Sequence, residues 1–325
     1  MLRRLLVVGF GAACLCAPAS ARAATVAIFY YPWYSTPSVD GAWQHWNQNG
    51  HRPPRDVYSR FYPLRGPYSS SDPSVLDRQM NEIAAAGIDE VIVSWWGRGS
   101  AEDERLPAVL DAARRHHLQV ALHLEPYQGR SPASVVGDLQ YAASLGIRDV
   151  YVYHPRDFAA ADWASVRADA PPGVRLFAGT WLVGFAAAGR FDGFYTYDFV
   201  NFGADKFARL CEEAHAVHLL CAPSVGPGYD GRRAGESPGG RARRNGQTYD
   251  LLWTAALAAD PDIVTITSFN EWGEGTQIEP AQAHSGYASY DGAWGATGNA
   301  ADWAYLSRTA YWTTKARSAT SATRR

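Results

Sequence analysis

Two glutamates stand three residues apart in the segment Asn-Glu-Trp-Gly-Glu-Gly, residues 270–275. If the chain makes one helical turn here, Glu271 and Glu274 lie on one face with their Cβ atoms roughly 5–6 Å apart. Carboxyl groups at that separation suit a pair that shares one reacting bond, with one group giving a proton and the other accepting one. Neutral hydrogen-bonding groups and the flat ring of Trp272 accompany the pair, and this mixture fits the hydroxyl edges and apolar faces of sugars.

The two acids follow a segment that predicts the end of a buried strand. Residues 263–268 form the run Ile-Val-Thr-Ile-Thr-Ser, which is typical of a strand in a parallel sheet. Gly273 and Gly275 tolerate backbone angles that other residues resist, so a tight exit loop is feasible. Solvated loop charges are the alternative interpretation of both acids, but the crowding of polar groups at one strand end favours a ligand site.

Strand-like and helix-like segments alternate along the chain, and their number decides the expected architecture. The expected strands are Val26–Tyr31, Glu90–Trp95, Gln119–Glu125, Asp149–Tyr153, Arg175–Thr180, Gly193–Tyr197, Leu219–Ser224 and Ile263–Ser268. The expected helices are Ser74–Ala86, Asp103–His117, Pro132–Leu145, Ala161–Ala168, Val183–Ala188, Asp205–His218, Asn245–Ala259 and Ala300–Ala316. Eight such pairs predict an α/β protein, a single-domain (β/α)8 TIM barrel over residues 24–317.

A barrel of this kind carries its active site at the C-terminal ends of its strands and in the loops that follow them. Aromatic, acidic and histidine residues gather at those positions in this sequence. They include Tyr30-Tyr31-Pro32-Trp33-Tyr34, Ser94-Trp95-Trp96, His123-Leu124-Glu125-Pro126-Tyr127, Tyr153-His154, Tyr195-Thr196-Tyr197-Asp198 and Tyr229-Asp230. The strand ends are therefore the expected substrate site.

Two loops are unusually long, and a loop of such length is usually functional or disordered. The first, residues 35–72, contains His45 and His51, but no third ligand at metal-site spacing accompanies them, so we expect no metal. The second, residues 226–244, is rich in Gly and Arg and is expected to be a solvated flap. One of Arg232 and Arg233, at the strand mouth, would be placed to hold a substrate hydroxyl or a neighbouring carboxylate.

The N-terminus indicates export. Residues 1–23 have a basic start, a short apolar middle and an Ala-Arg-Ala ending, which is the order of a secretory signal peptide cleaved after Ala23. The segment is too short to span a membrane, and we expect no span elsewhere. A secreted or periplasmic location follows, with a lipid anchor at Cys14 as the minor alternative. Residues 318–325 are small and basic and are expected to form a disordered tail.

Two cysteines remain in the expected mature chain. Cys211 and Cys221 form an even pair in an exported protein, which permits one disulfide between a helix and the next strand, with two buried thiols as the alternative. No His or acid accompanies either thiol in a nucleophile pattern, so neither is expected to be catalytic.

Charge and motif content exclude several partners. The formal net charge of −2 is a poor match for nucleic acid. No phosphate-cradling loop, nucleophile-elbow serine or dinucleotide motif is visible, so we expect no cofactor. The expected partner is an oligosaccharide or polysaccharide substrate, for which the 12 Trp and 18 Tyr offer many stacking rings.

The strand-end segments resemble glycoside hydrolase family 99, the endo-α-1,2-mannosidases and bacterial endo-α-1,2-mannanases. The resemblance covers most of the chain after residue 24, and the matching segments follow one another in the same order as in the family. Its segments are Phe29-Tyr30-Tyr31-Pro32-Trp33-Tyr34, Ser94-Trp95-Trp96, Glu125-Pro126-Tyr127-Gln128-Gly129-Arg130, Tyr195-Thr196-Tyr197, Ser224-Val225-Gly226-Pro227-Gly228-Tyr229 and, most specifically, Ser268-Phe269-Asn270-Glu271-Trp272 through Glu279.

The resemblance implies a catalytic pair with Glu271 as base and Glu274 as acid. It also implies retention of anomeric configuration, with the 2-hydroxyl of the substrate as nucleophile and a 1,2-anhydro sugar as intermediate. Glu274 then needs a raised pKa to hold its proton, and a neighbouring carboxylate with burial against Trp272 would raise that pKa. The residues by themselves give two carboxylates and a sugar-like site, and they leave direct carboxylate attack open.

The resemblance further implies a set of sugar-contacting residues. Trp96, Glu125, Tyr127, Tyr195 and Tyr197 match positions that line sugar subsites in the family, and Tyr31, Tyr229, Asn270 and Trp272 stand at the same strand ends. Tyr195 fits the packed barrel interior equally well, because alternate strand residues point inward. Glu125 is hard to explain structurally, since a buried acid without a partner is costly.

One position departs from the family pattern. Related sequences commonly have His between the Trp and the second Glu, where this chain has Gly273. We expect this change to remove a ring from the edge of the site and alter substrate preference while the acid pair stays intact.

These features together predict a secreted, retaining, endo-acting hydrolase of α-mannosidic glycans, with α-1,2 as the expected linkage. The alternatives are a non-catalytic carbohydrate-binding barrel, with Gly273 marking a degenerate site, and a hydrolase of another α-glycan.

Overall fold

The computed structural model describes residues 23–201, 203–235 and 240–322. Within these ranges, nine strand segments form one sheet in the order β8-β7-β6-β5-β4-β3-β1-β10-β9, and neighbouring strands run parallel. The strands are β1 (Thr25–Tyr30), β3 (Glu90–Trp95), β4 (Gln119–Leu124), β5 (Asp149–Val152), β6 (Arg175–Gly179), β7 (Gly193–Tyr195), β8 (Leu220–Ala222), β9 (Ser224–Val225) and β10 (Ile263–Ile266).

The sheet closes into a barrel at Pro223. β8 and β9 are the two ends of the sheet, yet only Pro223 separates them in the chain. Proline has no N–H to give to a neighbour, so it interrupts regular pairing, while its carbonyl still accepts the N–H of Thr265 at 3.1 Å. β8 and β9 together therefore act as one barrel strand, which is the strand expected at Leu219–Ser224.

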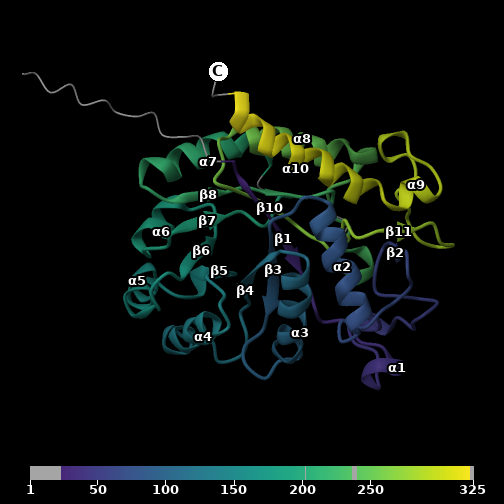
Figure 1. Ribbon diagram of the computed structural model, residues 1–325, viewed down its shortest axis with the longest axis horizontal. Helices are drawn as coiled ribbons and strands as arrows, with labels where there is room; N and C mark the ends of the chain where they lie inside the picture. The colour runs from purple at the N-terminus through teal and green to yellow at the C-terminus, as the bar shows by residue number, and fades with distance from the viewer. Residues whose placement is uncertain (1–22, 202, 236–239, 323–325) are drawn as a thin grey trace, which may run out of the picture.

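Helices form an outer ring around this barrel (Figure 1). They alternate with the strands along the chain, so the predicted (β/α)8 TIM barrel is confirmed. The helices of the ring are α2 (Pro73–Ala85), α3 (Ala101–Arg115), α4 (Pro132–Ser144), α5 (Ala160–Asp169), α6 (Val183–Ala188), α7 (Ala204–Ala216), α8 (Gln247–Ala258) and α10 (Ala304–Ala322).

Several helix starts are specified by side-chain caps. The carboxylate of Asp72 accepts the N–H of Ser74 at the start of α2, and the hydroxyl of Ser100 accepts the N–H of Asp103 in α3. α4 begins with a reciprocal capping box between Ser131 and Ser134. These caps satisfy N–H groups that have no partner within the helix, so they fix where each loop after a strand ends.

Short elements in the loops tie the first long loop to the segment after the acids. β2 (Tyr62–Pro63) lies in the first loop and pairs antiparallel with β11 (Ala281–Gln282). The remaining short helical segments are α1 (Pro37–Asp40), α9 (Asn299–Asp302) and the 3-10 turns Gln48–Gly50, Pro155–Asp157, Arg232–Ala234, Arg244–Gly246 and Ala293–Gly295.

Alternate strand residues fill the barrel interior. Along β1, Ala27 and Phe29 belong to a buried cluster to which the other barrel strands also contribute, whereas Val26 and Ile28 belong to the cluster that includes the helices. Tyr195 of β7 lies in the inner cluster and is wholly buried. Of the two interpretations of Tyr195, the barrel-interior one therefore holds.

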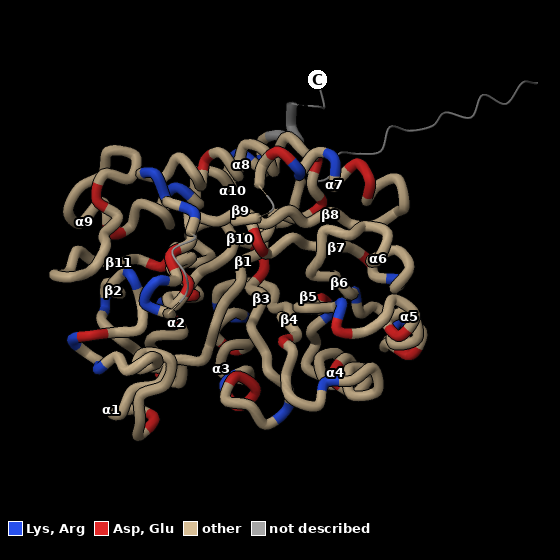
Figure 2. The backbone as a smooth tube through the Cα atoms, turned by 180° about the vertical axis from the view of Figure 1, so that it is seen from behind, with Lys and Arg blue, Asp and Glu red and all other residues tan. Residues whose placement is uncertain are grey.

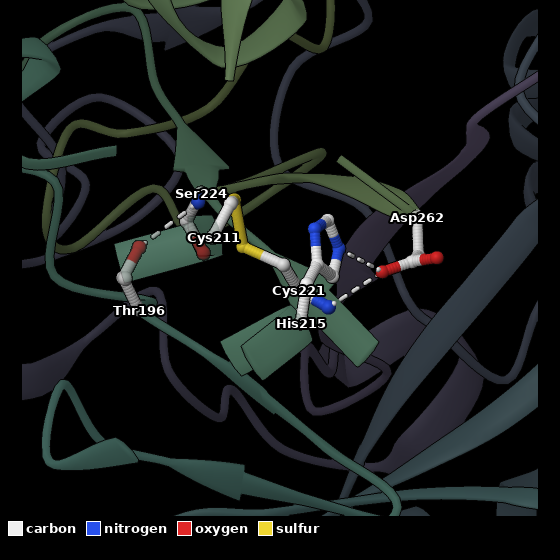
Figure 3. The surroundings of a disulfide bond; sticks show 6 residues. All are labelled: Thr196, Cys211, His215, Cys221, Ser224 and Asp262. Atoms are coloured by element: carbon white, nitrogen blue, oxygen red, sulfur yellow. Dashed lines mark hydrogen bonds and ion pairs between the residues drawn. A yellow bond between two sulfur atoms is a disulfide. The ribbon is translucent and has the colours of Figure 1, made fainter. Parts of the chain in front are cut away.

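A disulfide joins α7 to β8 (Figure 3). It links Cys211 and Cys221, so of the two states expected for these cysteines the disulfide is the one formed. Beside it, Oδ2 of Asp262 accepts the N–H of Cys221 at 2.9 Å and lies 3.0 Å from Nε2 of His215. The cross-link thus anchors the helix to the strand at which the barrel closes.

Both ends of the chain lie outside the described residues. Residues 1–22, which hold almost all of the expected signal peptide, lie outside the described residues, as do residues 323–325. α10 continues to Ala322, past the boundary expected at residue 317, so residues 318–322 of the expected tail are helical. Among the described residues, no helix combines the length and apolar character that a membrane span requires.

Basic and acidic residues are interspersed around the described helices and loops (Figure 2).

Candidate active site

Predicted site residues from β1, β4 and β10 meet at the C-terminal mouth of the barrel. Tyr31 follows β1, and burial first, then the charges of Glu125, Glu274 and Glu271, raises the pKa of its hydroxyl well above the usual value. All three carboxyl groups are therefore near enough to the Tyr31 hydroxyl to act on it through their charge. The structure thus brings both predicted catalytic acids together with the predicted sugar contact Glu125.

The two catalytic candidates sit on a compact loop that folds back on the end of β10. The N–H of Ser268 donates to the carbonyl of Thr276 at 3.0 Å, and the N–H of Ile278 donates to the carbonyl of Ser268 at 3.0 Å. Between these contacts the chain makes a tight turn over residues 272–275, in place of the α-helical turn considered from the sequence. The turn keeps Glu271 and Glu274 on one short segment.

Glu271 is buried, and the main chain holds its carboxylate. Oε1 accepts the N–H of Gly273 at 3.0 Å, while the N–H of Glu271 donates to Oγ of Ser268 at 2.8 Å. Burial and then the charge of Glu274 raise the pKa of Glu271 well above its usual value, against the lowering effect of the backbone donors. Such a pair favours a state in which one carboxyl group is protonated, which an acid and a base acting together require.

Glu274 lines a cavity of about 310 Å³ at the barrel mouth. Its side chain is half-buried, unlike that of Glu271, which is 7% exposed. The rest of the wall is Tyr153, Tyr197, Asp198, Phe199, Val200, Asn201, Tyr229, Thr267 and Thr276. Rings alternate with hydroxyl, amide and carboxylate groups on this wall, as a sugar-binding surface requires.

Two tyrosines connect the barrel strands below this cavity. The hydroxyls of Tyr31 and Tyr197 are 2.5 Å apart. Burial and then the charge of Glu274 raise the pKa of Tyr197 well above its usual value, and both residues line the same cavity. Tyr197 has a φ of 43°, a left-handed conformation that is uncommon for a tyrosine and is concentrated at functional sites.

Glu125 has partners that explain its burial. Oγ of Ser94 donates to its Oε1 at 2.8 Å, and Nδ1 of His123 lies 2.9 Å from the same oxygen. Nε2 of His123 lies 2.8 Å from the hydroxyl of Tyr195, and the imidazole stacks on Tyr197 with ring centroids 5.5 Å apart. The neighbours of Glu125 therefore fix its orientation beside the other acids.

His123 and Tyr153 belong to the site but were not among the predicted contacts. Tyr153 lines the cavity with Glu274, and burial followed by the charge of Glu274 raises its pKa. Both residues stand at strand ends, and this position was the only sequence feature that could have indicated them as site residues. The sequence did not show which of the alternating residues at each strand end point into the barrel mouth.

Asn270 and Trp272 are wholly buried, and this corrects the prediction that they contact the sugar directly. The amide of Asn270 accepts the N–H of Tyr31 at 2.8 Å and donates to its carbonyl at 3.0 Å. The indole N–H of Trp272 donates to Oε2 of Glu279 at 2.9 Å. Because the loop folds back on β10, these side chains point into the protein and hold the acid loop against β1. Tyr195, equally buried, acts through His123 in the same way.

Trp96 and Tyr127 stand at the rim. Trp96 follows β3 and is 39% exposed, so its ring is accessible to a ligand. The hydroxyl of Tyr127 donates to Oδ2 of Asp138 at 2.5 Å and lies 2.9 Å from Oγ of Ser134. Burial and then the bond to Asp138 raise the pKa of Tyr127 to about 12. Only the half-buried ring of Tyr127 remains for a sugar contact, because its hydroxyl is committed to α4.

The second long loop supports Glu274 through its backbone. The N–H of Asp230 donates to the carbonyl of Glu274 at 2.8 Å, and Arg232 binds the Asp230 carboxylate with two hydrogen bonds of 2.5 and 2.7 Å. Gly275 has a φ of +65°, and a Cβ there would lie 3.0 Å from the carbonyl oxygen of Asp230. Glycine is therefore required where this loop crosses the acid loop.

The two long loops also hold each other. Arg233 pairs with the carboxylate of Asp56 in the first loop, and Nδ1 of His51 lies 2.9 Å from that carboxylate. Nδ2 of Asn49 donates to the carbonyl of Ala234 at 2.6 Å. Arg232 and Arg233 thus each bind a neighbouring carboxylate, the second of the two roles considered for them.

Histidines of the first loop have partners other than a metal. The ring of His45 stacks on Trp33 with centroids 4.3 Å apart, and burial lowers the pKa of His45 to about 4. Across the described ranges, no group of three or more His, Cys, Asp and Glu side chains is placed to hold a metal ion.

The space beside Gly273 is filled by Tyr58 of the first long loop. A Cβ on Gly273 would lie 2.6 Å from Cε1 of Tyr58 and 3.1 Å from Oε1 of Glu271. The φ of Gly273 is not in the left-handed region, so glycine is needed here for space rather than for backbone conformation. A ring from another loop therefore lies where a larger residue 273 would project, and the expected change in substrate preference stays a prediction.

Comparison with known proteins gives consistent matches. The chain matches the family described as Glycosyl hydrolase family 99 over residues 22–160 and 176–318. It is 34% identical to the glycoprotein endo-alpha-1,2-mannosidase-like protein of Danio rerio, over 78% of this chain and 70% of the relative. The glycoprotein endo-alpha-1,2-mannosidase of Xenopus laevis is 34% identical over 78% of this chain and 69% of its own length. The solved GH99 endo-alpha-mannosidase from Bacteroides thetaiotaomicron superimposes with a TM-score of 0.82 at 30% identity, covering 90% of this chain and 98% of that one.

Proposed function

Because this chain belongs to glycosyl hydrolase family 99, it is a glycoside hydrolase, and we propose that it cleaves α-mannosidic linkages within glycan chains. The expected linkage is α-1,2, the one named for the Danio rerio and Xenopus laevis relatives. The observation that carries this proposal is that Glu274 lines the cavity at the barrel mouth while the buried Glu271 is held on the same short turn.

In the proposed first step Glu271 is the base and Glu274 is the acid. Glu271 removes the proton of the sugar 2-hydroxyl, and the resulting oxygen attacks the anomeric carbon as the bond from that carbon to the leaving oxygen breaks. Glu274 gives its proton to the leaving oxygen. A 1,2-anhydro sugar and a shortened glycan result, with Glu271 now protonated and Glu274 ionised.

Water opens the anhydro sugar in the second step. Glu274 takes a proton from water, whose oxygen bonds to the anomeric carbon as the bond from that carbon to O2 breaks. Glu271 returns its proton to O2. Both carboxyl groups end as they began, and the two inversions retain the anomeric configuration.

The environments of the two acids support these roles. A desolvated carboxylate is a stronger base than a hydrated one, so the raised pKa of Glu271 makes its ionised form a strong base toward a sugar hydroxyl, and the proposed roles require that the one proton of the pair resides on Glu274 when the substrate is bound. Glu274 lines the cavity, where it is placed to meet a leaving oxygen and then a water molecule.

The proposal includes export, directed by residues 1–23. The Cys211–Cys221 disulfide supports it, because disulfides persist mainly in oxidising compartments. The mature protein recovered outside the cytoplasm is then expected to begin at Ala24, which N-terminal sequencing checks.

Digestion of a glycan panel with product analysis tests the function. The panel contains α-1,2-linked mannan, glucosylated and mannosylated α-1,2-mannosides, and α-glucans of other linkages. The wild-type protein is expected to release oligosaccharides from the α-1,2-mannosides, while Glu271→Gln and Glu274→Gln each lose about 10³-fold in rate. Glu104→Gln, an exposed glutamate of α3, is the matched control and is expected to cleave like the wild type.

Other outcomes would redirect or remove the proposal. Cleavage confined to α-glucans would move the substrate to another α-glycan. Sugar binding without cleavage of any panel member would favour a non-catalytic barrel, and full activity in both catalytic variants would exclude this acid pair.

A further inference from the structure

We propose that Tyr58 is a further positioning residue of this site: its ring covers the Glu271 carboxylate from the side of Gly273 and keeps water from that side. The catalytic meaning of this assignment rests on the proposed function, in which Glu271 is the base. That the ring and the carboxylate both border Gly273 is a property of the fold and is testable without turnover.

The geometry around Gly273 places the ring and the carboxylate side by side. One point, the position that a Cβ of Gly273 would take, lies 2.6 Å from Cε1 of Tyr58 and 3.1 Å from Oε1 of Glu271. The same carboxylate oxygen accepts the N–H of Gly273 at 3.0 Å. The edge of the Tyr58 ring thus lies next to the space that the side chain of a larger residue 273 would fill. That side chain would lie beside the Glu271 carboxylate.

A structured part of the first loop holds Tyr58 in this place. Its N–H donates to the carbonyl of Trp46 at 2.8 Å, and the N–H of the preceding Val57 donates to the hydroxyl of Tyr287 at 2.8 Å. Val57 and Trp46 are wholly buried, so the backbone on this side of Tyr58 belongs to the core. The ion pair of Asp56 with the second long loop fixes the segment from outside. The backbone that carries the ring is therefore held in place.

A wall at this place changes the chemistry of Glu271. Burial is the largest cause of the raised pKa of Glu271, so admitting water on one side lowers that pKa and makes the carboxylate a weaker base. Besides Tyr58 itself, whose hydroxyl the Phe variant removes, the titratable groups whose charges interact with Glu271 are Glu274, Glu125, Tyr31, Tyr34 and Tyr197. A Tyr58 substitution leaves all of these in place.

The first test is the pH profile of kcat/KM for Tyr58→Ala and Tyr58→Phe. Tyr58→Ala is expected to lose about tenfold at the optimum and to move the acidic limb to lower pH by about 0.5 unit or more, because the base becomes more hydrated. Tyr58→Phe keeps the ring and is expected to keep the position of the limb. If Tyr58→Ala does not fold, Tyr58→Leu is measured in its place, with a smaller shift in the same direction.

Tyr287→Phe is the matched control for loosening of the loop. It removes only the hydroxyl that holds the N–H of Val57, so the acidic limb is expected to stay in place. A limb that shifts as much in Tyr287→Phe as in Tyr58→Ala, or that does not shift in Tyr58→Ala, overturns the assignment.

A double-mutant cycle with Gly273→Ala tests the contact directly. The added methyl group meets the Tyr58 ring, so Gly273→Ala alone is expected to lower kcat/KM tenfold or more. In the Tyr58→Ala background the same change is expected to cost clearly less, because the ring is gone and only the 3.1 Å approach to Oε1 of Glu271 remains. Additive losses would show that Tyr58 and Gly273 act independently and would contradict the proposal.

Titration of the Glu271 carboxyl group separates this inference from the proposed function. In full-length protein labelled with ¹³C at glutamate carboxyls, the Glu271 signal is identified by its absence in Glu271→Gln. A lower pKa for Glu271 in Tyr58→Ala than in the wild type supports the role of Tyr58 even if no mannoside is cleaved. An unchanged pKa overturns it even if the wild type cleaves every mannoside offered.

Discussion

Four glutamates lie in or beneath the barrel mouth, and the surroundings of each set its role. Glu271 is buried against main-chain donors, whereas Glu274 reaches the cavity. Glu125 is held by Ser94 and His123. Glu279 lies in the interior, beneath the acid loop, and supports it through Trp272. One residue type thus supplies a proposed base, a proposed acid, a third carboxylate beside them and a structural support.

Glu279 gives a prediction about stability and pH. Its carboxylate accepts hydrogen bonds from Gln79 at 2.7 Å, Tyr68 at 2.7 Å and Trp272 at 2.9 Å. Burial outweighs these donors and raises the pKa of Glu279 from 4.5 to about 7. A carboxyl group whose pKa is raised on folding contributes stability that is fully present below pH 4.5 and is lost as pH rises through about 7.

The free energy of unfolding is therefore expected to fall between pH 5 and pH 8 by about 2–3 kcal/mol more in the wild type than in Glu279→Gln, which cannot titrate. Urea denaturation at the two pH values measures the difference. Equal pH dependence in the two proteins would show that Glu279 ionises in the folded protein as readily as in the unfolded chain.

At the residue scale, the sequence predicts which residues belong to the site better than it predicts where their side chains point. The spacing of Glu271 and Glu274 is enough to indicate the acid pair, because a turn of either kind keeps residues three apart close together. The inward directions of Asn270 and Trp272 depend on how the turn folds back on β10, and spacing alone does not determine this. The contact of Tyr58 with Gly273 joins distant parts of the sequence, so no local pattern indicates it.

At the element scale, the loop after β10 is fastened to β1. Besides the Asn270 contacts, the hydroxyl of Tyr34 donates to the carbonyl of Asn270 at 2.8 Å and accepts the N–H of Trp272 at 3.1 Å. β1 and β10 are also paired in the sheet. The first and last strands of the barrel therefore both position the loop that carries the acids. Because these strands pair only when the barrel closes, the site forms only in the closed barrel.

The disulfide gives a prediction at this scale. It ties α7 to β8 next to Pro223, where the barrel closes. Replacing both Cys211 and Cys221 by Ser is expected to lower the free energy of unfolding by about 2–3 kcal/mol, the effect of a cross-link that closes a short loop. Thermal unfolding of the wild type and the double variant, with and without reductant, measures this. A reductant-sensitive Tm in the double variant, or an unchanged Tm on replacing the cysteines, would contradict it.

Most elements were predictable because apolar β-branched runs alternate with helical stretches at a regular interval. The break of one strand into β8 and β9 was not anticipated, although Pro223 is its physical cause. β2 and β11 were missed because two-residue strands carry no periodic signal, and their pairing is set by the fold of the long loops.

At the scale of the whole molecule, the barrel brings two long loops to one mouth, where each loop contacts the segment that carries the acids. The first loop supplies Tyr58 beside Gly273, and the second supplies Asp230 against the backbone of Glu274. The fold class followed from the alternation of strands and helices alone. The loops could not be placed from sequence, because their positions depend on ion pairs such as Arg233 with Asp56 that link them across the mouth.

The central claim is that Glu271 and Glu274 divide the proton transfers between them, and leaving-group dependence tests it most directly. The kcat/KM of each Gln variant, as a fraction of the wild-type value, is measured on a native α-1,2-mannoside and on the matching mannoside with an activated aryl leaving group, because kcat/KM reports the steps up to leaving-group departure and leaves out the role of Glu274 in the second step. Glu274→Gln is expected to retain a much larger fraction on the aryl substrate, since departure then needs no acid, whereas Glu271→Gln stays about 10³-fold below wild type on both. Selective recovery of Glu271→Gln on the aryl substrate, or wild-type rates in either variant on the native one, would contradict the account.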